Sequence, residues 1–308
     1  MPNGLVMRST GSWYDVRSEA GEITKCRLRG KFKIKGLKVS NPLAVGDWVV
    51  YEMEDAGEDT GVITKIQDRE NYIIRQSVHK TGHGHIIAAN LDQAILIVTL
   101  AYPKTSLGFI DRFLVSAESF RIPTKLIFNK VDLLDEGLLE EFDYLKAVYE
   151  PLGYECFLTS ATENVGIEEF KNLLHNKKSL LSGHSGVGKS TLVNAVSPEL
   201  NIRTSEISDF SHKGVHTTTF AEMHEIFPDS FIIDTPGIRE LGLLNIEKQE
   251  LGHYFPEMRA LLGECKFNNC IHVNEPQCAV IAAVEQGYIA PDRYESYLSM
   301  LANDDNRR

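Results

Sequence analysis

Hydrophobic and polar residues alternate with a period of two along the first quarter of the chain, as expected of strands with one buried face. Glycine and proline separate the alternating stretches and mark turns between them. The predicted strands cover residues 12–17, 22–29, 47–51 and 61–66. About five short strands in this length are typical of a small OB-type β-barrel, which we assign to residues 1–78.

From residue 91 to residue 245 the pattern changes to apolar, strand-sized runs that alternate with helical periodicity. Strands are expected at residues 93–100, 125–128, 154–158, 178–182, 220–227 and 231–233, with helices at 108–120 and 190–196. This alternation predicts an α/β domain with a mostly parallel sheet. Residues 79–90 contain glycine and lack apolar periodicity, so we expect a linker there.

A small helical domain is predicted for residues 246–308. Its two helices are expected at residues 279–286 and 292–301, with Pro291 starting the second. We expect residues 303–308 to be frayed.

One stretch of the α/β domain fits the phosphate-binding pattern G-x-x-x-x-G-K-[ST]. The glycines let backbone N–H groups close around a phosphate, Lys189 supplies a cation for the terminal phosphates, and Ser190 supplies a hydroxyl for Mg²⁺. A strand enters the loop and a helix leaves it, so a helix N-terminus faces the phosphates. The alternative is a glycine-rich surface turn. The predicted phosphate-loop residues are Gly183, His184, Ser185, Gly186, Val187, Gly188, Lys189, Ser190 and Thr191.

Two shorter motifs predict that the nucleotide is GTP or GDP. The first is N-K-x-D, in which the Asp132 carboxylate can accept bonds from the N1–H and the exocyclic amine of guanine, a pair of donors that adenine lacks. The second is Ser160-Ala161, which fits the loop that closes over the base by backbone contacts. Each is weak alone, but both follow strands, where open α/β sheets bind ligands. The first motif comprises Asn129, Lys130, Val131 and Asp132.

Downstream of the phosphate loop, a strand ends in Asp234-Thr-Pro-Gly237. Asp234 would hold Mg²⁺ through water, and the Gly237 N–H could contact the γ-phosphate. A polar segment before this strand ends in Thr217, Thr218 and Thr219, of which we choose Thr218 as the Mg²⁺ ligand, although the sequence does not distinguish them. Because the base-recognition motifs precede the phosphate loop, the domain resembles a circularly permuted GTPase.

Three of the five cysteines lie between residues 265 and 278. With one histidine they supply the four ligands of a closed, structural Zn²⁺ site, which leaves no position for catalysis by the metal. The alternative is a set of unliganded thiols beside a surface histidine. By contrast, the three histidines within residues 79–85 have no Cys or carboxylate partner and are not expected to bind metal. The predicted zinc ligands are Cys265, Cys270, His272 and Cys278.

The formal net charge of −11 argues against a nucleic-acid partner, but the charge is uneven. Residues 1–80 hold 13 Lys/Arg and 11 Asp/Glu, so the acidity belongs to the later domains. Six cations in the barrel alternate with other residues and share one strand face, and no carboxylate lies between Lys25 and Lys38. The face is either solvated or, as we favour, a surface that follows RNA phosphates. This basic stripe comprises Lys25, Arg27, Arg29, Lys31, Lys33 and Lys35.

Over nearly its whole length the chain resembles the bacterial family of ribosome small subunit-dependent GTPase A. The resemblance implies a Mg²⁺-dependent GTPase that binds the 30S subunit late in its maturation, with the barrel and the zinc domain contacting 16S rRNA. Many GTPases place a glutamine after D-x-x-G to orient the attacking water, but this chain has Ile238. The resemblance points to His216 as the replacement, against the alternative of a solvated loop residue; Lys189 and Thr218 complete the predicted catalytic set.

No apolar run reaches the length of a membrane span and no secretion signal precedes the barrel, so we expect a cytoplasmic protein, and we expect it to be a monomer. Two other function classes are weighed. A P-loop ATPase or small-molecule kinase would need a different base pocket from the one that N-K-x-D predicts. A nucleic-acid adaptor with a merely structural nucleotide would bind RNA equally in every nucleotide state.

Overall fold

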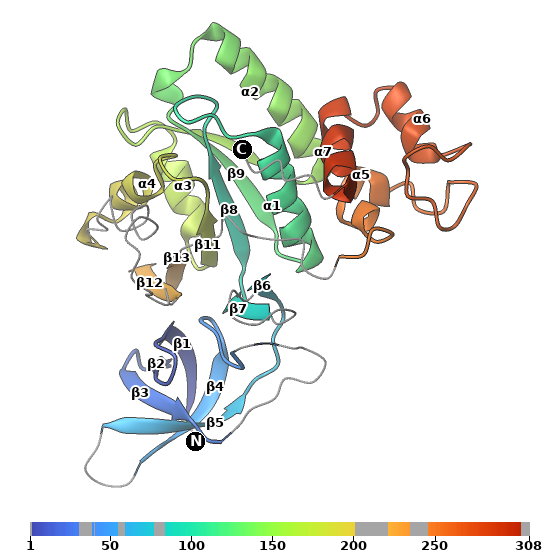
Figure 1. The fold of residues 1–308 in the computed structure, drawn as a ribbon. Coiled ribbons are helices and arrows are strands. Elements are labelled where there is room, and N and C mark those ends of the chain that lie inside the picture. Colours follow the sequence, from blue (N-terminus) through green and yellow to red (C-terminus); the bar gives the residue numbers. More distant parts are fainter. Residues whose placement is uncertain are drawn as a thin grey trace, which may run out of the picture.

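The computed structural model describes residues 2–30, 39, 41–54, 59–76, 84–200, 221–234 and 246–302. Figure 1 shows the barrel at one end, the α/β domain above it, and a small helical domain packed against the side of the α/β domain. The three-part architecture agrees with the predicted fold class.

Five strands close into the barrel in the order β1-β2-β3-β5-β4 and back to β1, with β3 and β5 parallel. Their bounds are β1 (Asn3–Ser9), β2 (Tyr14–Ser18), β3 (Ile23–Leu28), β4 (Trp48–Met53) and β5 (Thr60–Ile66). The predicted strands missed β1. The physical reason is that Val6 faces the barrel core whereas Leu5 and Met7 face the core of the α/β domain, so the polar half of the alternation is absent.

The segment predicted as a linker, residues 79–90, is corrected over its described part. Gly84–Ala89 forms strand β7, which pairs antiparallel with β6 (Tyr72–Gln76) in a separate two-stranded sheet. The residues from Ile86 to Ala89 are buried, and Ile87 and Ala88 join the core of the α/β domain. The sequence pattern did not predict this short apolar strand, because glycines and histidines precede it in the segment. Residues 79–83 lie outside the described part of the chain.

The α/β domain has a six-stranded sheet in the order β10-β9-β8-β11-β13-β12, parallel except for β12. The strands are β8 (Gln93–Val98), β9 (Thr124–Asn129), β10 (Cys156–Thr159), β11 (Lys178–Ser182), β12 (Glu222–Phe227) and β13 (Ser230–Asp234). The helices are α1 (Leu107–Ser119), α2 (Glu136–Tyr149), α3 (Ile167–Leu174) and α4 (Lys189–Val196). Short 3-10 turns are η1 (Val131–Leu133), η2 (Glu150–Leu152) and η3 (Pro198–Leu200).

Helices cover both faces of this sheet, as the parallel pattern requires. Helices α1 and α2 share one core with alternate residues of the central strands, including Leu96 and Phe128. Helices α3 and α4 share a second core with the intervening residues, including Ile97 and Ile127. The sheet is therefore buried on both sides, and only its strand ends are free to carry a site.

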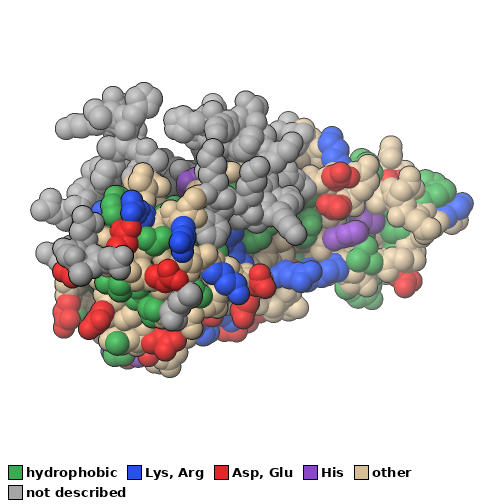
Figure 2. Space-filling view, turned by 90° about the horizontal axis from the view of Figure 1, so that it is seen from below, with side chains coloured by type: hydrophobic (Ala, Val, Ile, Leu, Met, Phe, Trp, Pro, Cys, Tyr) green, Lys and Arg blue, Asp and Glu red, His purple; other side chains and the backbone are tan. Residues whose placement is uncertain are grey.

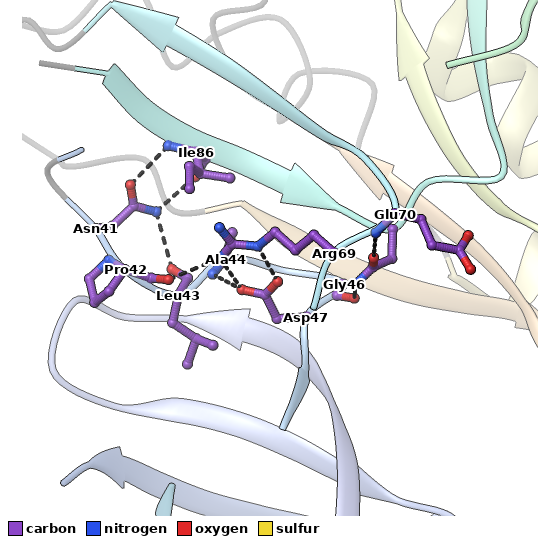
Figure 3. Close-up of polar contacts among 10 residues, drawn as sticks. Asn41, Pro42, Leu43, Ala44, Gly46, Asp47, Arg69, Glu70 and Ile86 are labelled. Atoms are coloured by element: carbon purple, nitrogen blue, oxygen red, sulfur yellow. Dashed lines mark hydrogen bonds and ion pairs between the residues drawn. The ribbon is translucent and has the colours of Figure 1, made fainter. Parts of the chain in front are cut away.

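Strand pairing fastens the barrel to the α/β domain, and a buried ion pair joins the loop before β4 to the segment that follows β5. Arg8 of β1 pairs with Glu222 of β12, which joins the two sheets into one of eleven strands. In the loop before β4, the Asp47 carboxylate accepts two bonds from Arg69, both 2.6 Å long, and a third from the Ala44 N–H at 2.8 Å (Figure 3). Burial raises the pKa of Asp47, and the bonds and charge of Arg69 oppose this shift only in part. A carboxylate in this buried position therefore depends on its hydrogen-bond partners.

Gly46 lets this loop approach β7 closely. Its φ is +88°, and a Cβ at this position would lie 2.1 Å from the Ala89 carbonyl oxygen. Beside it, Asn41 exchanges two hydrogen bonds with the backbone of Ile86, at 2.8 and 2.9 Å (Figure 3). The loop before β4 and strand β7 therefore form one fixed joint.

The C-terminal domain consists of η5 (Leu251–Tyr254), α5 (Pro256–Arg259), α6 (Ala279–Glu285) and α7 (Pro291–Ala302). Both predicted helices are confirmed, and Pro291 starts α7 as expected. Arg293 of α7 is buried and pairs with Asp111 of α1 at 2.6 Å and with Glu257 of α5 at 2.8 Å. The domain lies beside α1 (Figure 1), and a buried ionic network joins the two.

Candidate nucleotide and metal sites

The predicted nucleotide residues gather at the carboxyl ends of the parallel strands. The phosphate loop follows β11, N-K-x-D follows β9, and Ser160-Ala161 follows β10. The strand order changes direction between β8 and β11, and ligands of open α/β sheets bind at such a point. Three motifs far apart in the sequence therefore converge on one edge of the sheet.

Two glycines of the phosphate loop are required by close contacts. Gly183 has φ +147°, and a Cβ there would lie 2.2 Å from the Ile97 carbonyl oxygen. Gly188 has φ +94°, and a Cβ there would lie 2.4 Å from Asn129 Nδ2. The loop is thus held between β8 and the base-recognition motif, and it leads directly into the N-terminus of α4.

The side chains at the end of the loop lie over the loop itself or within the first turn of α4. Lys189 Nζ donates to the carbonyl oxygens of Gly183 at 2.7 Å and His184 at 2.9 Å, so its ammonium lies over the loop. Ser190 is buried in the first turn of α4, whereas Thr191 is exposed. The predicted pattern therefore has the local geometry of a phosphate-binding loop.

Asn129 connects the base-recognition motif to the phosphate loop. Its Nδ2 donates to the Val187 carbonyl at 2.8 Å, and its Oδ1 accepts a bond from Thr159 Oγ1 at 3.0 Å. All three residues are buried. The sequence places Thr159 directly before Ser160-Ala161, but its side-chain bond to Asn129 was not predicted, since only strand pairing brings the two residues opposite each other.

The predicted guanine-binding residues are held in place by their neighbours. Ser160 Oγ donates to Asp132 Oδ1 at 2.5 Å and receives the Glu163 N–H at 3.1 Å. Lys130 has φ +66° and donates to the Tyr102 carbonyl at 2.6 Å. Tyr102 lies in the loop after β8 and was not predicted; its contribution is a carbonyl oxygen, which no side-chain pattern reveals.

Some of the remaining predicted site residues lie in described elements, and the others lie outside the described part of the chain. Val131 starts η1 and Ala161 is half-buried beside the α3 and α4 core. Asp234 ends β13 opposite Leu181, but its side chain is not described. Outside the described residues lie His216, Thr217, Thr218, Thr219 and Gly237.

The four predicted metal ligands form one cluster. Their ligand atoms all lie within 4.8 Å of one another, with His272 Nδ1 3.3 Å from Cys278 Sγ and 3.6 Å from Cys265 Sγ. A tetrahedron with metal–sulfur bonds of about 2.3 Å has edges of about 3.8 Å. Three thiols and one imidazole at these separations fit a tetrahedral, closed Zn²⁺ site.

The loop that carries His272 is shaped by contacts that the sequence did not reveal. Glu275 accepts the backbone N–H groups of Ile271 and Val273, both at 2.8 Å. Burial acts to raise the pKa of Glu275, but these backbone donors outweigh it and lower the pKa to about 2. Burial lowers the pKa of His272, which favours the neutral imidazole that a metal ligand needs.

The prediction of an unneutralised basic stripe is corrected over its described half. Lys25 and Arg27 are exposed on β3, as period two predicted, but Arg27 forms an ion pair with Glu54 and Arg29 lies 3.6 Å from Glu52. These carboxylates come from β4 and the residue after it, outside the sequence window that was free of acids. Figure 2 shows blue and red side chains intermixed on the barrel end. The other members of the stripe, Lys31, Lys33 and Lys35, lie outside the described residues.

A search of the described helices for one long and apolar enough to cross a membrane finds none.

Comparison with known proteins gives matches over the whole chain. A family model described as RsgA GTPase matches residues 66–244, and one described as RsgA N-terminal domain matches residues 3–63. The chain is 57% identical to the small ribosomal subunit biogenesis GTPase RsgA of Cytophaga hutchinsonii over 305 residues, 99% of either chain. It is 50% identical to the protein of that name from Bacteroides fragilis over 298 residues, which are 97% of this chain and 96% of the relative.

Solved structures agree in fold. YjeQ from Thermotoga maritima superimposes with a TM-score of 0.80 at 39% identity, covering 100% of this chain and 99% of that one. YloQ, described as a circularly permuted GTPase, superimposes with a TM-score of 0.75 at 30% identity, covering 100% and 96%.

Proposed function

This chain belongs to the RsgA GTPase family, and on that premise we propose that it binds the small ribosomal subunit and hydrolyses GTP during late maturation of that subunit. Its relatives are named for small ribosomal subunit biogenesis, and it matches them over 97–99% of its length.

The observation that carries the nucleotide part of this proposal is the bridge made by Asn129. One amide side chain bonds both to the phosphate loop, at Val187, and to the strand that leads into Ser160-Ala161. Since Ser160 in turn holds one oxygen of Asp132, base recognition and phosphate binding form a single hydrogen-bonded unit. Such a unit favours guanine over adenine, because the Asp132 carboxylate requires two neighbouring donors on the base.

In the proposed mechanism Lys189 stabilises the negative charge that develops on the terminal phosphates. Ser190 and Thr218 would hold Mg²⁺, with Asp234 contributing through water, and the metal would neutralise phosphate charge when bound. His216 would orient the attacking water in place of the usual glutamine, since Ile238 cannot polarise water. Replacing His216 with alanine should leave GTP affinity intact and lower ribosome-stimulated turnover; unchanged turnover would show that another group orients the water.

We also propose one structural Zn²⁺ ion, held by Cys265, Cys270, His272 and Cys278. The donor set and its separations support this, and the ion would fix the loop between α5 and α6 relative to α7. The exposed side chains of Phe267 and Val273 on this loop, together with the exposed cations of β3, would then contact 16S rRNA.

The test is GTP hydrolysis by the purified protein, alone and with purified 30S subunits, with ATP as the control nucleotide. Stimulation that requires both GTP and 30S subunits is the expected result. Tight GTP binding without any stimulation would remove the ribosome as activator and favour the adaptor alternative. Displacement of bound GTP by ATP as well as by GDP would instead favour the ATPase or kinase alternative.

A further inference from the structure

The phosphate loop makes an aromatic contact with α1 that its motif does not require. The imidazole ring of His184 lies against the ring of Phe109, with centroids 3.8 Å apart and planes inclined by 32°. His184 occupies the second position of the loop, where the phosphate-binding pattern accepts any residue. Phe109 lies in the first turn of α1 and is 7% exposed.

The backbone of His184 supports the cation of the loop. Its carbonyl oxygen accepts the ammonium of Lys189 at 2.9 Å, beside the bond from the same ammonium to Gly183. A shift of the His184 peptide would therefore move Lys189 away from the position in which it faces the phosphates. The side chain of His184 is the part of this residue that can be held from outside the loop.

Phe109 can hold it because α1 is itself fixed along its length. Asp111 accepts bonds from Tyr149 at 2.8 Å and from Arg293 at 2.6 Å, and all three residues are buried. Further along the helix, Glu118 pairs with Arg259 at 2.8 Å. The C-terminal domain thus anchors α1 at two points beyond the ring that touches the loop.

We propose that Phe109 is a positioning residue for nucleotide binding, which fixes the phosphate loop through the ring of His184. The proposal extends the nucleotide-binding assignment of this loop and depends on it. Phe109 is packed in the core beside α1, and its effect reaches the nucleotide through the ring of His184, the His184 backbone and Lys189. Its loss therefore weakens nucleotide binding, and because Lys189 also stabilises the charge that develops on the phosphates, it lowers kcat/KM for GTP by at least the same factor.

The test compares Phe109→Leu with Phe113→Leu. Both side chains are buried on α1 one turn apart and share one core, and the ring of Phe109 is the one that lies 3.8 Å from the ring of His184. We expect Phe109→Leu to weaken GDP binding by about 2- to 13-fold, the range that corresponds to about 0.5–1.5 kcal/mol for an aromatic pair. The value of kcat/KM for GTP should fall by at least the same factor, while Phe113→Leu leaves GDP affinity as it is.

A double-mutant cycle with His184→Ala separates a positioning role from a general loss of packing. His184→Ala should weaken GDP binding by a similar factor, the double variant should be no weaker than either single one, and His184→Phe, which keeps a ring, should weaken binding less than His184→Ala. Additive losses, or an equal loss in Phe113→Leu, would overturn the proposal. Failure of the wild-type protein to bind GDP would instead overturn the nucleotide assignment itself.

Discussion

The buried pair of Asp47 and Arg69 should govern the stability of the barrel. Asp47 is 0% exposed and the Arg69 side chain is 10% exposed, and the carboxylate holds both Arg69 and the Ala44 N–H. Asp47→Ala leaves a buried guanidinium without its counter-ion, which costs about 3–5 kcal/mol. A unit of about 66 residues has roughly 3–10 kcal/mol of stability in total, so the loss leaves the barrel only marginally folded.

Tryptophan fluorescence isolates this effect, since both tryptophans of the chain, Trp13 and Trp48, lie in the barrel. With a urea dependence of about 1 kcal/mol per molar for so small a unit, the unfolding midpoint should fall by about 3–5 M. GDP binding, measured in parallel, reports whether the α/β domain remains folded. We expect it to be retained.

Two further variants test whether the loss of stability comes from the unpaired buried charge. Glu52→Ala removes an exposed pair with Arg29 in the same barrel and should cost only about 0–1 kcal/mol. The double variant Asp47→Ala with Arg69→Met leaves no charge buried, so it should recover part of the loss. Two results would refute this account. One is an unfolding midpoint for Asp47→Ala equal to that of Glu52→Ala. The other is a double variant whose loss of stability equals the sum of two independent losses.

Three other predictions concern the sites. Gly188→Ala should reduce GDP affinity by about 100-fold, because the left-handed backbone costs about 1–2 kcal/mol and the displaced Asn129 bond about 1–3. Gly153→Ala, at the same φ of +94° with nothing within 4 Å, should leave affinity unchanged, and an equal loss there would contradict the steric explanation. Burial raises the pKa of Cys26 to about 11 and of Cys156 to about 12, so at pH 8 both thiols stay protonated and buried. A thiol reagent should therefore modify three cysteines of the folded protein after chelation of zinc and none before it; modification of all three without a chelator would argue against the metal. Glu54→Gln releases Arg27 and should strengthen 30S binding at low salt, steepening the plot of log affinity against log salt by about one unit. Glu19→Gln, which changes the charge equally at a turn of the barrel, is the control. An equal gain in 30S affinity there would show that the effect comes from net charge alone.

Much of the site could be predicted because its motifs all follow strands of one parallel sheet. Once β9, β10 and β11 are recognised, their carboxyl ends must share an edge, and residues 178–182 were predicted with the bounds that β11 has. The metal cluster was predictable because its four ligands lie close together in the chain and need only one loop to meet.

The rest depended on which strands are neighbours, which local patterns do not encode. Thr159 meets Asn129 through strand register, and Glu54 meets Arg27 across the barrel from a distant part of the sequence. Strand β1 escaped prediction because it is buried on two sides by two different domains, so it lacks the alternation by which its neighbours were recognised.

The pairing of β1 with β12 also has a consequence for synthesis of the chain. The first residues of β1 are covered by β4 as soon as the barrel is complete, but Arg8 pairs with Glu222, more than two hundred residues later. At about 5–20 residues per second, the ribosome needs roughly 10–40 s to make that partner. During this interval the nascent barrel carries an open strand edge beside Leu5 and Met7. A chain interrupted before residue 222 keeps that edge, which is the feature that promotes strand-to-strand association between copies.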